Sequence, residues 1–269
     1  MRWPRIFALL FMVMFSCPIW VAWLADFLEG RRALSSDIHV LTFTVTCTAV
    51  VAWFLMAVQT SVSFAYERDH GTLDAILTTP MTASFIVLGK LAGVYRSSAF
   101  AVLFPLAFIV YAYTSSVVSW RAAVLASVVL FITGFAAAAW GMVCSVRAGS
   151  STKASGWALG VLLVLFVGAP LLMQLLLRRP DQYDWLPLTL VSPSLNISYA
   201  IFENADYSYP YGGISELYTW MGLLILSCVH LTFALVLAFV FTIYSIIWVE
   251  RSYRSGGKLQ AHPPVRTAV

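Results

Sequence analysis

Residues 120–146 read WRAAVLASVVLFITGFAAAAWGMVCSV, and Arg121 is the only charged residue in this run. As an α-helix, a stretch of this length crosses the hydrocarbon core of a bilayer, which is about 30 Å thick. The apolar residues follow one another without the regular polar–apolar alternation of a barrel strand. The run therefore predicts a transmembrane helix.

Further stretches of the 269-residue chain have the same character, namely residues 6–25, 39–65, 85–113, 156–177 and 219–249. We interpret 6–25 as a retained span, because its apolar run is too long for a typical signal peptide. The composition, 61% hydrophobic and 10% charged, holds more apolar surface than a domain folded in water can bury. The sequence thus predicts an all-α integral membrane protein with six transmembrane helices. We expect one domain, residues 1–254, and a disordered cytoplasmic tail, residues 255–269.

Basic residues predict how these helices are oriented in the membrane. With the N-terminus in the cytoplasm, eleven Lys and Arg residues fall inside and five fall outside. The inside set is Arg2, Arg5, Arg68, Lys90, Arg96, Arg147, Lys153, Arg251, Arg254, Lys258 and Arg266; the outside set is Arg31, Arg32, Arg121, Arg178 and Arg179. These charges lie at the ends of apolar runs and form no basic stripe with aromatic residues between them. The pattern predicts a multi-pass cell-membrane protein with both termini cytoplasmic, and it argues against nucleic-acid binding.

The spans carry few groups that can perform chemistry. Their interior polar residues are Gln59, Gln174, His230 and several hydroxyls, and we interpret His230 as a hydrogen-bonded packing residue. The buried carboxylates of an ion-coupled carrier are missing, as are the HExxH, GxSxG and GxxxxGK[ST] patterns. We therefore predict a chain without catalytic residues, a metal site or a bound cofactor. Energy for uphill transport must then come from a partner.

Small residues recur four apart in several spans, at Gly89 and Gly93, Gly134 and Ala138, Ala137 and Gly141, and Gly156 and Gly160. Such faces let helix backbones approach closely. Packing within the bundle is the favoured interpretation, and a contact between two chains is the alternative. Three prolines, Pro18, Pro105 and Pro170, predict kinks in their spans.

The segment between the second and third spans is cytoplasmic in this orientation, and residues 67–81 read ERDHGTLDAILTTPM. Leu73, Ile76 and Leu77 share one face at helical spacing. Gly71 permits a sharp turn after the second span, and Pro80 stops the helix. The segment predicts a short amphipathic helix that can transmit motion from a docked protein into the membrane.

The longer string ERDHGTLDAILTTPMTASFIVLGK, residues 67–90, resembles the ERxxGTLExLLxTPxxxxxxxxGK pattern of ABC-2 type permeases. The matching residues are Glu67, Arg68, Gly71, Thr72, Leu73, Leu77, Thr79, Pro80, Gly89 and Lys90. Asp74 replaces the commoner Glu, and Ile76 replaces a commoner Leu. The six-span layout extends the resemblance along nearly the whole chain.

The resemblance implies a coupling helix that contacts a cytoplasmic ABC ATPase subunit. The residues it assigns to this contact are Glu67, Arg68, Asp69, Gly71, Thr72, Leu73, Asp74, Leu77 and Pro80. It also implies pairing with a second permease copy or a homologous permease, with ATP and Mg²⁺ held by the ATPase. The expected role is the permease subunit of an ATP-driven exporter, whose substrate the sequence does not identify.

Two other functions stay open at this stage. The chain can instead anchor an ATPase in an assembly, maturation or motility complex, or it can be a membrane enzyme or an ATP-independent channel. Transport of a solute by the purified complex distinguishes an exporter from a membrane anchor. Binding of an ATPase distinguishes an exporter from a membrane enzyme or an ATP-independent channel. The external segment 178–218 is rich in Tyr and Trp; an aromatic belt at the membrane surface is favoured there over a ligand site.

Overall fold

A computed structural model describes residues 38–78, 81–114, 118–168 and 214–254 of the chain. Every element in these ranges is helical. They are α2 (Ile38–Asp69), α3 (Leu73–Leu77), α4 (Ala83–Thr114), α5 (Trp120–Arg147), α6 (Ser151–Leu163), the π-helical turn η1 (Val164–Gly168) and α10 (Ile214–Arg254). The predicted first span, most of the external segment and the predicted tail lie outside the described residues.

Four helices in the described ranges, α2, α4, α5 and α10, are long and apolar enough to cross a membrane. They correspond to the predicted spans 39–65, 85–113, 120–146 and 219–249. The predicted span 156–177 is described only as far as 168, where α6 and η1 form a shorter apolar helix. The class of all-helical membrane protein is therefore confirmed, while the number of six spans stays a prediction.

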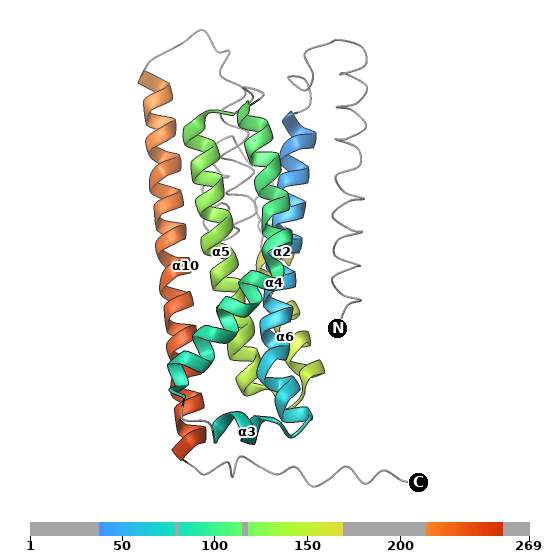
Figure 1. Ribbon diagram of the computed structural model, residues 1–269. Coiled ribbons are helices and arrows are strands. Elements are labelled where there is room, and N and C mark those ends of the chain that lie inside the picture. Colours follow the sequence, from blue (N-terminus) through green and yellow to red (C-terminus); the bar gives the residue numbers. More distant parts are fainter. Residues whose placement is uncertain (1–37, 79–80, 115–117, 169–213, 255–269) are drawn as a thin grey trace, which may run out of the picture.

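Helix α5 is the centre of the bundle, since it contacts α2, α4, α6 and α10 (Figure 1). Its contact with α2 is the most extensive, and the small residues of α5 explain why. Gly134 lies against Met56 and Trp53 of α2, and Gly141 lies directly against the backbone of Ala57. The indole nitrogen of Trp53 donates a hydrogen bond to the carbonyl oxygen of Leu130, at 2.9 Å. The small-residue face of α5 thus packs within the bundle, as predicted.

The small residues of α4 and α6 behave differently. Gly89, Gly93, Gly156 and Gly160 are exposed, and a Cβ atom added at each would meet nothing within 4 Å. Pro105 lies inside α4 as expected, and the two halves of this helix run in different directions (Figure 1). His230 of α10 is buried, with its Nε2 atom 3.4 Å from Oγ1 of Thr133 on α5, which fits a packing residue.

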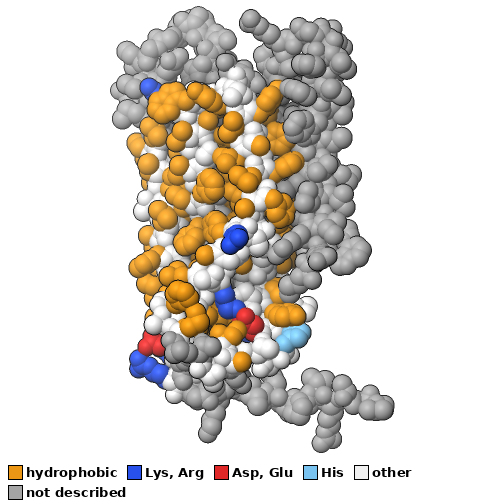
Figure 2. Space-filling view, viewed as in Figure 1, with side chains coloured by type: hydrophobic (Ala, Val, Ile, Leu, Met, Phe, Trp, Pro, Cys, Tyr) orange, Lys and Arg blue, Asp and Glu red, His pale blue; other side chains and the backbone are white. Residues whose placement is uncertain are grey.

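The surface of the bundle is divided in the way a membrane protein requires. Hydrophobic side chains cover most of the described surface along the helices, whereas charged side chains gather toward the end that carries α3 (Figure 2). The described basic residues at or near that end are Arg68, Lys90, Arg147, Lys153, Arg251 and Arg254. Arg96, also in the predicted inside set, lies farther along α4, and Arg121 lies near the start of α5 at the opposite end. This division is the one used to predict the orientation, and the α3 end is the predicted cytoplasmic side.

Candidate functional site

Helix α2 ends in a turn that the sequence of residues 67–72 explains. The Gly71 amide donates to the carbonyl of Arg68 at 3.1 Å, and the Thr72 amide donates to the carbonyl of Glu67 at 2.9 Å. This pair of bonds is a Schellman motif, which satisfies carbonyls that the helix end leaves unpaired. It needs a left-handed residue after the helix, and Gly71 has φ 68°. The predicted sharp turn at Gly71 is therefore confirmed.

The short helix α3 follows this turn and lies across the end of the bundle (Figure 1). Its Leu73 side chain is 6% exposed, and Ile76 is half-buried; both pack against the hydrophobic core of the bundle. Ala75 and Thr78 are exposed on the other side. Leu73 and Ile76 thus face the bundle, and the side of α3 that carries Ala75 and Thr78 is open at this end. The side chains of Asp74 and Leu77, and all of Pro80, lie outside the described residues.

The helix α2 continues to Asp69, so Glu67, Arg68 and Asp69 form its last turn. The sequence placed these three residues in the connecting segment, because an apolar run indicates where a span leaves the membrane and not where its helix ends. Each of the three charged side chains contacts a different neighbouring helix. Together they join the end of α2 to α4, α5 and α6.

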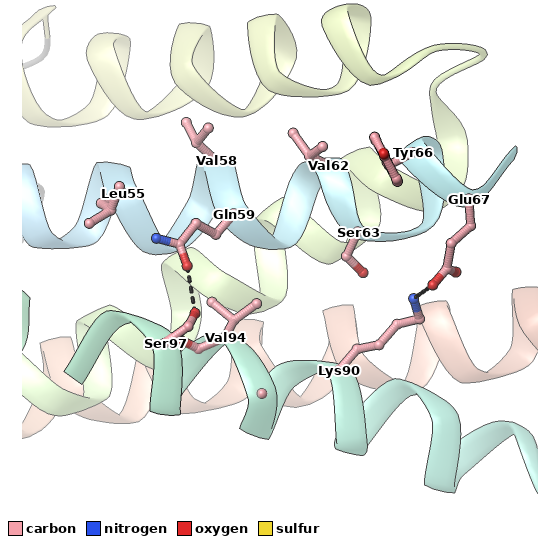
Figure 3. Close-up of a pocket in the computed structure, with 11 residues that line it drawn as sticks. Leu55, Val58, Gln59, Val62, Ser63, Tyr66, Glu67, Lys90, Val94 and Ser97 are labelled. Atoms are coloured by element: carbon pink, nitrogen blue, oxygen red, sulfur yellow. Dashed lines mark hydrogen bonds and ion pairs between the residues drawn. The ribbon is translucent and has the colours of Figure 1, made fainter. Parts of the chain in front are cut away.

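Glu67 contacts α4. Its Oε1 atom lies 2.5 Å from the Nζ atom of Lys90, and both side chains are about four-fifths buried, at 21% and 17% exposed. The Lys90 ammonium also lies 4.3 Å from the centre of the Phe64 ring. Figure 3 shows α2 and α4 diverging from Ser97 toward Lys90, with this ion pair bridging the wider end.

Arg68 contacts the end of α5. Its guanidinium donates to the carbonyl oxygen of Ala148 and, at 3.2 Å, to that of Val146. Both carbonyls belong to the C-terminal end of α5, where no helical amide can reach them. The Arg68 guanidinium carbon also lies 5.3 Å from the ring of Trp248 on α10. Arg68 thus caps α5 and packs on α10.

Asp69 contacts the start of α6. Its Oδ2 atom accepts a hydrogen bond from the amide of Ser151 at 2.9 Å. This amide is one of the unpaired donors at a helix N-terminus, and a carboxylate there also interacts favourably with the helix dipole. The last turn of α2 therefore holds the adjoining ends of α5 and α6.

Loss of the Arg68 contacts is expected to destabilise the bundle. In Arg68→Met, the apolar stem remains but the carbonyls of Val146 and Ala148 lose a charged donor, which costs about 2 kcal/mol. Arg68→Lys keeps the charge with a single ammonium, and its stability is expected to fall between those of the parent chain and Arg68→Met. Thermal unfolding of the purified chain in detergent measures the difference. Equal stability of Arg68→Met and the parent chain would contradict this capping role.

The structure divides the predicted contact residues into two groups. Glu67 and Arg68 are partly buried and make contacts inside the chain, Leu73 is buried, and Asp69 is exposed although it accepts from the Ser151 amide. The exposed residues of the turn and α3 are His70, Gly71, Thr72, Ala75 and Thr78. A docked protein can reach these exposed residues, here called the α3 surface, and Asp69 beside them. That any of these residues contacts an ATPase stays a prediction.

Sequence reasoning missed the partners of the last turn of α2, here called the charged turn, which consists of Glu67, Arg68 and Asp69. In the sequence, Lys90 counts as a motif residue and as an inside charge, but its opposite charge to Glu67, at the two ends of the motif, was a usable signal for their pairing. No signal in the sequence pointed to the backbone carbonyls of Val146 and Ala148 or to the amide of Ser151. Contacts between residues about 80 positions apart depend on how the helices pack.

A family model described as "ABC-2 family transporter protein" matches residues 32–245. No curated protein matches the chain. The matched range includes the charged turn, the α3 surface and most of the residues of the bundle.

Proposed function

The chain belongs to the ABC-2 transporter family, and from that premise we propose that it is the permease subunit of an ATP-driven exporter. In this proposal α3 is the coupling helix, and a separate cytoplasmic ABC ATPase subunit docks on the α3 surface. Two permeases, either two copies of this chain or this chain and a homologous one, form the translocation path. ATP and Mg²⁺ are bound by the ATPase, and both termini of the permease lie in the cytoplasm of a cell-membrane complex.

The charged turn is the observation that carries this proposal. A protein that pushes on α3 displaces a segment joined to α2 by the Schellman turn. The last turn of α2 is in turn tied to Lys90 of α4, to the end of α5 and to the start of α6. These ties are an ion pair and charge-assisted hydrogen bonds, which are stronger than hydrogen bonds between neutral groups. Motion at α3 therefore reaches four helices through three consecutive residues.

Docking of an ATPase is tested with a matched pair of threonines. Thr78 is exposed on the α3 surface and Thr114 is exposed at the far end of α4, and each hydroxyl donates at 2.9 Å to a carbonyl three residues earlier. We expect Thr78→Arg to reduce the recovery of a soluble ABC ATPase with the tagged chain at least tenfold, because a long charged side chain is forced into the interface. Thr114→Arg should not change recovery.

The measurement is affinity purification from native membranes, with mass spectrometry of the proteins that accompany each variant. The parent chain should bring down an ATPase at about equal stoichiometry. Recovery of no ATPase with the parent chain would contradict the proposed function. Equal recovery with Thr78→Arg and Thr114→Arg would remove α3 from the interface.

Transport then distinguishes an exporter from a membrane anchor for an ATPase. The purified complex is placed in vesicles with a panel of amphiphilic, peptide and glycolipid substrates, and ATP-dependent movement is measured. An exporter moves at least one of them, and hydrolysis rises in its presence. A complex that hydrolyses ATP but moves none of the panel would favour the anchoring role in an assembly, maturation or motility apparatus.

A further inference from the structure

A groove of about 450 Å³ lies between α2 and the first half of α4, a volume typical of small-molecule sites. It lies where the two helices diverge, and the ion pair of Glu67 and Lys90 stands at its wider end (Figure 3). Its lining includes Leu55, Val58, Gln59, Ser63 and Glu67 of α2 and Lys90 of α4. Most of the lining surface is apolar, and polar side chains reach it from both helices.

Three of those polar groups end in a buried atom without a partner. Nε2 of Gln59, Oγ of Ser63 and Oε2 of Glu67 make no hydrogen bond to any described residue. The three residues are spaced four apart on α2, so they follow one face over roughly 12 Å. An unpaired polar atom is costly inside a bilayer, where no bulk water can satisfy it. Their alignment along one groove points to a ligand that pairs with them.

The chemistry of the three atoms has an order along the groove. Glu67 Oε2 can only accept, because Oε1 of the same carboxylate already holds Lys90. Gln59 Nε2 is an amide nitrogen and can only donate, while Oε1 of the same amide accepts from Ser97 at 2.7 Å and from Ser98 at 3.0 Å. The Ser63 hydroxyl lies between them and can do either.

Charged and apolar side chains are also ordered along the groove, from the α3 end toward the middle of α2. At the α3 end, Glu67 and Lys90 present one negative and one positive charge side by side. Past Gln59, the lining ends in the apolar side chains of Leu55 and Val58. A ligand matching this order has a zwitterionic head with an N–H donor, then acceptor oxygens, then apolar chains.

We propose that the groove binds one phospholipid whose head group carries a primary ammonium. The ammonium donates to Glu67 Oε2, and the phosphate lies beside the Lys90 ammonium, which has N–H groups beyond the one that meets Glu67. The ester carbonyls accept from Ser63 and Gln59, and the acyl chains follow Leu55 and Val58 into the membrane. The assignment to the cytoplasmic leaflet rests on the proposed function, which puts α3 in the cytoplasm.

Lipid binding is measured by native mass spectrometry on the purified, delipidated full chain. Phosphatidylethanolamine and phosphatidylcholine with the same acyl chains are offered in separate titrations. We expect one tightly held phosphatidylethanolamine per chain. Phosphatidylcholine should bind about tenfold more weakly, because its trimethylammonium has no N–H to donate to Glu67. Equal retention of the two lipids would overturn the proposal.

A plug in the groove provides the matched variant. Gly93 lines the groove, and a Cβ atom added there meets nothing within 4 Å, so Gly93→Leu fills the space without a clash at its base. Gly160 on α6 is equally open but does not line the groove, so Gly160→Leu is the control. We expect Gly93→Leu to lose the bound phosphatidylethanolamine and Gly160→Leu to keep it. Retention in Gly93→Leu would place the lipid elsewhere.

Two other occupants of the groove give distinct results. A groove filled by water alone, or covered by another part of the chain or by a second copy, retains neither lipid, and that result overturns the proposal. The assay contains no ATPase, so such a failure leaves docking at the α3 surface untouched. Conversely, a chain that holds phosphatidylethanolamine but recovers no ATPase would retain the lipid site and lose the proposed function.

Discussion

Gly141→Ala is expected to destabilise the bundle by about 3 kcal/mol, the upper end of the usual cost of overpacking. A Cβ atom at this position would overlap the carbonyl oxygen of Ala57 and the hydroxyl of Thr60 on α2. Neither can move aside easily. The first is backbone, and the second is held by hydrogen bonds to the carbonyls of Met56 and Ala57, at 2.9 and 3.0 Å. The helices α2 and α5 must therefore separate along their most extensive contact.

Two other glycines make this prediction specific. At Gly134 the nearest atom is Sδ of Met56 at 3.2 Å, and a methionine side chain can shift, so Gly134→Ala should cost less. At Gly160 nothing lies within 4 Å, and alanine there is expected to stabilise α6 by about 0.5–1 kcal/mol. Unfolding free energies in mixed detergent micelles measure all three variants. A change in unfolding free energy of the same sign and size for Gly141→Ala and Gly160→Ala would contradict the close packing of α2 on α5.

Gly71→Val is expected to uncouple ATP hydrolysis from transport in the assembled complex, with transport reduced at least tenfold while hydrolysis continues. Gly71 has φ 68°, a conformation that costs an L-residue about 1–2 kcal/mol and suits a β-branched residue least. The valine variant therefore breaks the Schellman turn and changes how α3 is held against α2. The bundle itself stays folded, because the added Cβ atom meets nothing within 4 Å.

Gly71→Asn is the matched control, since asparagine tolerates the left-handed conformation. It adds a side chain at the same exposed place and should keep coupling close to that of the parent complex. ATP hydrolysis and substrate movement are measured together in vesicles for both variants. Loss of coupling in both would assign the effect to the docking surface itself, and unchanged coupling in Gly71→Val would separate the turn from the mechanism.

Much of this fold could be predicted from sequence because hydrophobic runs report directly on membrane spans. The predicted run 120–146 and helix α5, Trp120–Arg147, agree within one residue. The predicted run 39–65 ends four residues before α2 does, because Glu67, Arg68 and Asp69 are helical although they are charged. Charge marks the edge of the apolar core, whereas the end of this helix is set by the glycine turn that follows.

The candidate site was predictable only in part. Gly71, Leu73 and Ile76 have local roles in a turn and on a helix face, and such roles can be read from neighbouring residues. The roles of Gly134 and Gly93 cannot be read in this way, because each glycine belongs to a pair of small residues four positions apart and the two pairs look alike in sequence. One packs against α2 and the other lines an open groove, and the difference depends on how each helix is rotated in the bundle.

The residue at position 67 makes its two attachments with different parts of itself. Its carbonyl oxygen accepts from the Thr72 amide and, at 3.2 Å, from the Thr72 hydroxyl, whereas its carboxylate holds Lys90. Every amino acid supplies that carbonyl, but only an acid supplies the carboxylate. A substitution at position 67 can therefore remove the link to α4 while the turn after α2 is kept. Natural variation at position 67 can adjust how tightly α4 follows the movement of α2, while the shape of the turn between α2 and α3 stays the same.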